Sequence, residues 1–151
     1  MGLDLTYIAG QTPLDEDEKE GLKIPTIATK EELDEFKQQN IEQAIQWSLS
    51  RNFRAGQILT EKFIKGLHKR MLGNVWKWAG CFRLTNKNIG VDKWQIATSL
   101  KVLLDDTLFW IEHETYTPVE TALRFKHRLV SIHCFPNGNG RHSRLMADIL
   151  V

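Results

Sequence analysis

A turn rich in glycine and asparagine, placed between two amphipathic stretches, constrains the fold of this chain most. Residues 133–144 read HCFPNGNGRHSR. Pro136 removes a backbone donor and residues 137–140 tolerate positive φ, so a helix that precedes them must end and a tight loop must follow. A second helix is predicted to start near Arg141, because apolar residues recur there at helical spacing. These residues are Leu145, Met146, Ile149 and Leu150.

A glycine-rich loop that leads into a helix is an anion-binding arrangement, because backbone N–H groups converge there and the helix dipole adds positive charge. Arg141 and Arg144 share one face of the first turn, where each cation is disfavoured by roughly 0.3–1 kcal/mol unless an anion is bound. Two guanidinium groups at this spacing can both bind phosphate oxygens. The sequence therefore favours a ligand with more than one phosphate. An ordinary helical turn with solvated arginines is the alternative.

The same stretch resembles the signature of the Fic family, His-x-Phe-x-x-Gly-Asn-Gly-Arg-x-x-Arg, and every fixed position is filled. By this resemblance, His133 is the base that deprotonates a target hydroxyl, and Phe135 anchors the loop in the core. The resemblance assigns the nucleotide phosphates to the other motif residues. These are Gly138 and Gly140 through their backbone amides, and Asn139, Arg141 and Arg144 through their side chains.

Two positions depart from the usual form of the motif. Cys134 stands where proline is common, and Asn137 stands where the family has an acidic metal ligand. The family resemblance implies Mg²⁺ as a cofactor, with Asn137 as its ligand in this chain. Because an amide oxygen contributes no charge to a hard cation, we expect Mg²⁺ to bind weakly.

The resemblance implies a protein adenylyltransferase that moves AMP from ATP to a Ser, Thr or Tyr hydroxyl of a target protein. The Doc branch, which transfers a terminal phosphate, has lysine in place of the second motif glycine, whereas this chain retains Gly140. A Doc-like phosphotransferase remains an alternative. A nucleotide-binding regulator or toxin-antitoxin component with little catalysis is a further alternative. Asn137 in place of an acidic metal ligand favours it, whereas the intact His133 argues against it, because a protein that only binds nucleotide needs no base. The chain also resembles the Fic branch called mobile mystery protein B, and a regulatory protein partner is compatible with this reading.

Composition limits the other classes of partner. The 151 residues are 42% hydrophobic and carry a net charge of +1, with charges mixed throughout. Neither nucleic acid nor an anionic membrane is therefore indicated. Two cysteines without an apolar leader predict a reduced, cytoplasmic protein. The final helix is still apolar at Val151, without a stop signal, so the chain looks truncated.

The chain is predicted to divide into an arm, residues 1–28, and a Fic-like domain, residues 29–151. The arm is acidic and turn-rich, and a solvated arm is the simplest interpretation. Many Fic proteins carry an inhibitory helix that ends in Glu-Gly or Glu-Asn, whose glutamate pairs with the second motif arginine. Glu20 followed by Gly21 resembles the end of that pattern, although Glu16 occupies its Ser/Thr position.

The fold is predicted to be mainly α, a Fic-like helical bundle with one β-hairpin. Capping boxes begin at Thr29 and Thr117, and Thr60 is a further N-cap. Strand-forming residues interrupt the helical pattern within residues 82–97, where we expect a hairpin. In Fic proteins this hairpin is the flap that holds the target by strand addition. The flap residues expected here are Leu84, Thr85, Ile89 and Trp94.

Other histidine and cysteine chemistry fits the sequence less well. Adjacent residues seldom face each other, so Cys134 is expected to be a small buried hydrophobe rather than a nucleophile paired with His133. His68 is expected to be a surface or hydrogen-bonded histidine, and no standard zinc spacing is present. His133 ends a predicted helix, whose dipole favours protonation. A neutral base therefore needs a compensating environment that the sequence does not identify.

Overall fold

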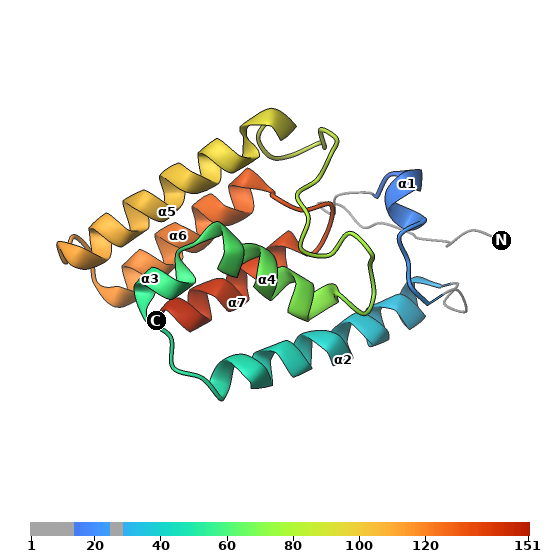
Figure 1. Cartoon of the computed structure of the whole chain (residues 1–151), viewed down its shortest axis with the longest axis horizontal. Coiled ribbons are helices and arrows are strands. Elements are labelled where there is room, and N and C mark those ends of the chain that lie inside the picture. Colours follow the sequence, from blue (N-terminus) through green and yellow to red (C-terminus); the bar gives the residue numbers. More distant parts are fainter. Residues whose placement is uncertain (1–13, 25–28) are drawn as a thin grey trace.

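The computed structural model describes residues 14–24 and 29–151, and its architecture is helical (Figure 1). The long helices are α2 (Lys30–Leu49), α4 (Glu61–Leu72), α5 (Ile96–Glu112), α6 (Pro118–Ile132) and α7 (Asn139–Leu150). Helices α5, α6 and α7 pack in sequence, and α4 packs between α7 and α2. Three shorter elements join them: α1 (Glu16–Lys19), α3 (Ala55–Ile58) and the 3-10 helix η1 (Lys93–Gln95).

The three predicted N-caps are confirmed. Thr29, Thr60 and Thr117 each accept a hydrogen bond from the backbone N–H three residues later, at 3.1–3.2 Å between donor and acceptor. Pro118 occupies the first turn of α6, where its missing N–H has no helical partner to lose. Because local side-chain chemistry fixes these helix starts, they follow directly from the sequence.

The core lies where the long helices meet. The long helices contribute apolar side chains to it, and the side chain of Phe135 is fully buried among them. Phe135 belongs to residues 133–138, which join α6 to α7 and which we call the motif loop. The principal core residues are Leu33, Ile41, Ile64, Leu67, Met71, Leu100, Leu103, Phe125, Leu129 and Met146. The core therefore holds the C-terminal end of α6 and the N-terminal end of α7 in fixed positions.

The predicted hairpin within residues 82–97 is not confirmed: in the described part of the chain this segment is a loop followed by η1, without strands. The side chain of Arg83 explains why, because its guanidinium donates to the carbonyls of Thr85 and Val91. Those carbonyls are then unavailable to a strand ladder. The N–H groups of Arg83 and Val91 donate instead to Cys134 and Ile132, at 2.9 and 3.3 Å. We call residues 82–92 the flap loop; its backbone N–H groups at Arg83 and Val91 bond to the motif loop and to the end of α6 and form no strand ladder within the loop.

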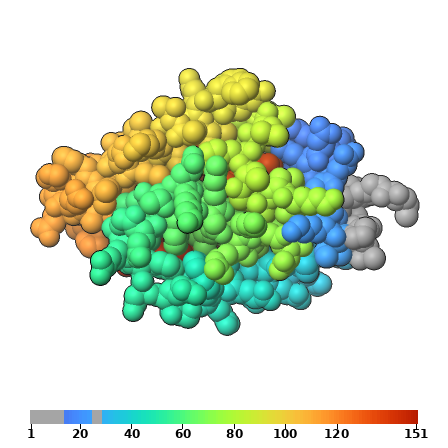
Figure 2. Space-filling model, in the orientation of Figure 1, coloured from blue at the N-terminus to red at the C-terminus, as the bar shows by residue number. Residues whose placement is uncertain are grey.

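Residues 14–24, which include α1 and which we call the α1 segment, pack against the flap loop, as the contact between the blue and yellow-green surfaces shows (Figure 2). The Thr85 hydroxyl donates to the Asp15 carboxylate at 2.7 Å, and the Lys87 ammonium pairs with Asp15 and Glu18. An isolated antiparallel bridge between Leu22 and Trp76 holds the other end of the segment. The described part of the predicted arm, residues 14–24, is therefore docked against the flap loop, with several of its acidic side chains exposed; residues 1–13 and 25–28 of the arm lie outside the described residues.

Candidate active site

His133 lies at the C-terminal end of α6 in a left-handed conformation, with φ 57° and ψ 63°. Few residues other than glycine adopt this region, and such backbone strain is concentrated at functional sites. The left-handed turn ends the helix and directs the chain into the motif loop. Only 8% of His133 remains exposed.

The Nε2 atom of His133 is buried and makes no hydrogen bond to any residue that the structure describes. Burial, together with the positive charges of Arg83 and Lys87, lowers the pKa of the imidazole to about 4. These effects outweigh the helix dipole, which favours protonation. They supply the compensating environment that the sequence did not identify. At neutral pH, His133 is therefore a neutral imidazole with an available lone pair.

Asn139 holds the motif loop closed through its side chain. Its Oδ1 accepts from the N–H of Phe135 at 3.0 Å, and its Nδ2 donates to the Phe135 carbonyl at 2.7 Å. Both polar groups of the amide are thus used within the loop. The resemblance assigned this side chain to the phosphates, but the structure places it as a brace for the loop.

The N-terminus of α7 is open to a ligand. Gly138 is its N-cap, with φ 80°, and no side chain caps the helix. A side chain at this position would be strained, and its Cβ would lie 2.6 Å from Leu72 Cδ1. The uncapped first N–H groups of α7 and the helix dipole together form a cradle for an anion.

His68 supports this loop from α4, a role that sequence reasoning missed. It is buried, so the surface alternative was wrong and the hydrogen-bonded one is confirmed. Its Nδ1 accepts from the Gly80 N–H at 2.9 Å, and its Nε2 donates to the Asn137 carbonyl, also at 2.9 Å. The ring also stacks on Phe135 with 3.8 Å between centroids. Nothing in the local sequence indicated this contact, because its partners lie 12 and 69 residues away.

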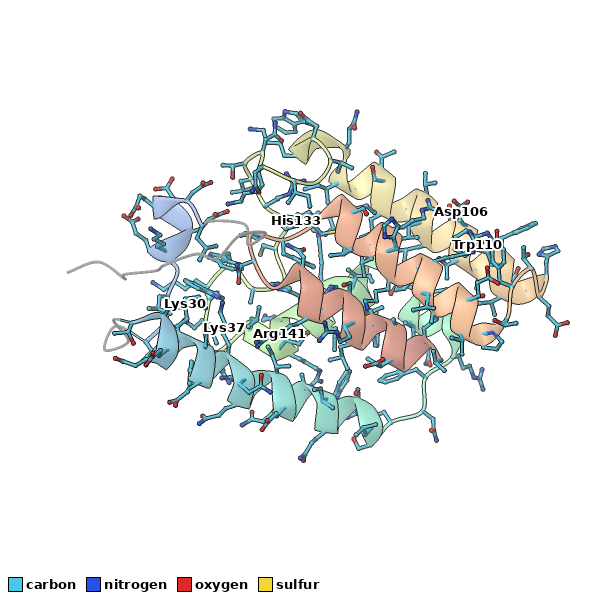
Figure 3. The ribbon with its side chains drawn as sticks, turned by 180° about the vertical axis from the view of Figure 1, so that it is seen from behind. Lys30, Lys37, Asp106, Trp110, His133 and Arg141 are labelled. Atoms are coloured by element: carbon cyan, nitrogen blue, oxygen red, sulfur yellow. The ribbon has the colours of Figure 1, made fainter. Side chains whose placement is uncertain are left out.

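A cavity of about 590 Å³ opens beside the motif loop. Its charged lining residues are Lys30, Asp34, Lys37 and Arg141, and His133 forms part of its wall. Lys30, Lys37, Arg141 and His133 gather at the same end of the bundle (Figure 3). Other lining residues that bear on function are Leu14, Ile89, Asn137, Gly138, Asn139 and Gly140. The cavity thus joins the predicted base and the predicted anion cradle.

The two motif arginines do not share this cavity in the described residues. Arg141 is exposed and lines the cavity, and its Nη1 donates a hydrogen bond to Gln38 Oε1 at 3.4 Å. Arg144 is exposed on α7 but is not among the lining residues. Glu20 is likewise exposed and outside the lining, and it forms no ion pair with Arg144 among the described residues.

The donor set at Asn137 does not fit a metal ion held by the protein. The Oδ1 of Asn137 accepts from the Lys37 ammonium at 3.0 Å, so a cation already occupies the oxygen that a metal ion would use. Asp34 is the only carboxylate among the described lining residues, and it pairs with Lys30 at 2.7 Å. Among the described residues, no group of three histidine, cysteine or acidic side chains is arranged to hold a metal.

The expected flap residues are exposed, and one of them lines the cavity. Leu84 and Trp94 are 84% and 82% exposed, and Ile89 is half-exposed and lines the cavity. The Thr85 hydroxyl is engaged by Asp15. These side chains leave apolar surface exposed on the flap loop and η1.

Cys134 is buried, and burial raises the pKa of its thiol to about 12. A thiol that stays protonated at neutral pH is not a nucleophile. The expectation that Cys134 is a small buried hydrophobe is therefore confirmed. In the same described part of the chain, no helix is both long and apolar enough to span a membrane.

Solved structures share this fold. The chain matches the FIC domain of Bep8 from Bartonella sp. 1-1C with a TM-score of 0.69 and 18% identity, over 83% of this chain and 67% of that one. It matches BepC from Bartonella tribocorum, which was solved with bound AMPPNP, with a TM-score of 0.68 and 19% identity, over 95% and 74% of the two chains. At these identities the similarity shows the fold alone.

Curated relatives match in sequence over part of their length. The chain is 35% identical over 97 residues to the protein adenylyltransferase Fic of Drosophila grimshawi, covering 62% of this chain and 20% of that protein. It is 32% identical over 93 residues to the protein adenylyltransferase fic-1 of Caenorhabditis elegans, covering 56% and 18%. The matched region thus spans about a fifth of these relatives. The Fic/DOC family model matches residues 58–151, well over half of the sequence, and the chain therefore belongs to the Fic/DOC family.

Proposed function

We propose that this chain is a protein adenylyltransferase that moves AMP from ATP to a Ser, Thr or Tyr hydroxyl of a target protein. The observation that carries the proposal is the neutral His133, whose buried, unpartnered Nε2 stands in the wall of a cavity lined by cations. The sequence relatives named as protein adenylyltransferases support the same reaction.

In the proposed reaction, His133 Nε2 accepts the proton of the target hydroxyl. The hydroxyl oxygen attacks the α-phosphorus of ATP, the bond to the β-phosphate oxygen breaks, and pyrophosphate leaves. A positioned base of this kind contributes roughly 10²–10⁴-fold to the rate. The N–H groups at the start of α7 and the Arg141 guanidinium neutralise charge on the phosphates.

Mg²⁺, which the family resemblance implies, is proposed here only as an ion carried by the phosphates of ATP and by water. Asn137 offers no charge, and its oxygen is bound by Lys37, so the chain's own donors do not fit a protein-held metal. The role of Arg144 in binding the nucleotide remains part of the proposal and requires its exposed side chain to turn toward the cavity.

The target is proposed to dock on the exposed apolar side chains of the flap loop and η1. Ile89 connects this surface to the cavity that contains His133. Because the backbone of the flap loop is bound to the motif loop, a docked segment is held at a fixed position relative to His133. We place the protein in a reducing compartment such as the cytoplasm, because Cys81 and Cys134 are both free thiols.

A second candidate is a nucleotide-binding regulator with little catalysis, acting with a regulatory protein partner. The position of Arg144 outside the cavity lining favours it, because one of the two expected phosphate ligands is then missing. A Doc-like phosphotransferase is favoured less, since Gly140 is retained where that branch has lysine.

Labelled ATP separates these functions. The protein is incubated with cell lysate and ATP labelled at either the α or the γ phosphate. We expect label in protein only from the α position, and His133→Ala should abolish it while leaving ATP affinity unchanged. Transfer from the γ position would indicate the phosphotransferase, and ATP binding without transfer would indicate the regulator.

A further inference from the structure

Lys37 on α2 is a charged residue of the cavity that the proposed reaction has not yet used. Its side chain is half-buried and lines the cavity together with the start of α7. It reaches Asn137, which lies 100 residues later in the chain, at 3.0 Å. Figure 3 shows Lys37 on α2 at the end of the bundle that also carries Arg141.

The surroundings of Lys37 favour an added anion. Burial lowers the pKa of its ammonium to about 8; Asp34 opposes this change, whereas Arg141 and Lys30 add to it. The carboxylate of Asp34 is shared with Lys30. The described lining thus holds three cationic side chains and a single carboxylate. Moving a cation out of water is costly unless an opposite charge compensates it.

The hydrogen-bonding capacity of Lys37 points the same way. An ammonium group has three N–H donors, and within the described residues one of them is used by Asn137 Oδ1. The ring of Trp76 contributes a weak cation–π contact, with 5.8 Å between Nζ and the ring centroid. Two donors therefore remain for oxygen atoms of a ligand in the cavity.

We propose that Lys37 binds the phosphate groups of the nucleotide, and that its ammonium supplies the positive charge at the motif position where this chain has Asn137 and no carboxylate to hold a metal ion. This inference rests on the proposed function, because it takes ATP as the ligand of the cavity. Asn137 acts as a positioning residue, since its amide oxygen holds the ammonium beside the cradle formed by α7.

If the proposal is correct, the ATP affinity of this protein depends less on Mg²⁺ than it would if a carboxylate held the metal ion. It is tested by calorimetric titration of the whole chain with ATP, once with Mg²⁺ and once with EDTA. We expect the wild-type protein to bind in both conditions. Lys37→Gln should weaken binding by about ten- to hundredfold in both, which is the range for loss of a charge-assisted hydrogen bond. Lys37→Arg should retain most of the affinity.

A matched control removes one positive charge elsewhere. Lys101 pairs with Asp105 on the exposed surface of α5, so Lys101→Gln should bind ATP like the wild type. Equal affinities for Lys37→Gln and Lys101→Gln, with wild-type binding intact, would overturn the inference and leave the proposed function standing. Thermal unfolding of each variant shows whether a loss of binding reflects loss of the fold.

Inorganic triphosphate separates the two proposals further. Binding of triphosphate that depends on Lys37, without any transfer from labelled ATP, would support the inference and overturn the proposed function. Failure of the wild-type protein to bind either ATP or triphosphate would overturn both.

Discussion

Arg83 donates through Nε to the backbone carbonyl of His133 at 2.5 Å, which joins the flap loop to the proposed base across 50 residues of sequence. The same guanidinium binds carbonyls of Thr85, Val91 and Ile132. Arg83 therefore holds the flap loop, the end of α6 and the left-handed turn at His133 in one arrangement. Its charge also lowers the pKa of the His133 imidazole.

Replacing Arg83 should loosen this arrangement. Arg83 is 2% exposed, so Arg83→Gln leaves several buried carbonyls without donors and should lower the free energy of unfolding by ~2–4 kcal/mol. Urea denaturation measures the change. Arg128→Gln is the control, because its partner Asp106 is on the surface and exposed pairs contribute ~1 kcal/mol or less. Equal losses in the two variants would show that Arg83 does not hold the loops together.

The pH dependence of the transfer rate on the acid side should reflect the low pKa of His133. An ordinary histidine loses its function as a base when the pH falls below about 6.5. Because burial lowers this pKa to about 4, transfer should persist from pH 7 to pH 5 and fall only near pH 4. A pH profile of labelling from α-labelled ATP tests this expectation. A midpoint near 6.5 would contradict the buried, neutral state of His133.

Protein stability should also fall on acidification. Burial lowers the pKa of His68 to about 3 and of His142 to about 4, and His133 behaves likewise. Between pH 6.5 and 4 the unfolded chain therefore binds more protons than the folded one, so the free energy of unfolding rises with pH and is lost as pH falls. Urea midpoints measured at pH 7.5, 6.5 and 5.5 should decrease in that order. A flat profile would mean that these imidazoles are solvated.

Trp94 should contribute to target docking and not to nucleotide binding. Trp94→Ala removes a large exposed apolar side chain from η1, so labelling of the target should fall about tenfold while ATP affinity stays constant. Leu49→Ala is a matched control, because Leu49 is also 80% exposed but lies at the end of α2. If both variants label the target equally, the target docks elsewhere.

Glu18 and Glu20 of the α1 segment can be replaced separately to test whether this segment affects the rate of target labelling through the flap loop or through the nucleotide site. Glu20 is exposed and outside the cavity lining, whereas the Glu18 carboxylate pairs with Lys87 of the flap loop. We expect Glu18→Gln to change the rate of target labelling and Glu20→Gly to leave it unchanged. A higher rate for Glu20→Gly would instead support the inhibitory role that the family resemblance suggests for this glutamate.

The sequence predicted those parts of the molecule that depend on near neighbours. Thr29, Thr60 and Thr117 begin helices because each caps an N–H three residues away, and the apolar spacing of each helix then defines its buried face. The break between the two helices at residues 136–138 followed in the same way, whereas the burial of Phe135 was expected from the family resemblance.

Long-range contacts explain what the sequence did not reveal. The hairpin is absent because Arg83 binds carbonyls of its own segment and of the motif loop, up to 50 residues away. Lys37 and Asn137 form a hydrogen bond although they are 100 residues apart in the chain. Neither a lysine nor an asparagine by itself indicates that the other is its partner. Propensity and spacing describe single segments, so they carry no information on which segments meet.

The proposed base and the proposed phosphate cradle are separated by a single short loop, from His133 at the end of α6 to Gly138 at the start of α7. Asn139 closes this loop, and Phe135 fixes it in the core. No hinge therefore lies between proton acceptor and phosphates, so closure of one lobe on another is not needed to align them. We therefore expect a small molecule that inhibits the proposed transfer to bind at the mouth of the cavity, and its inhibition to be competitive with nucleotide or target.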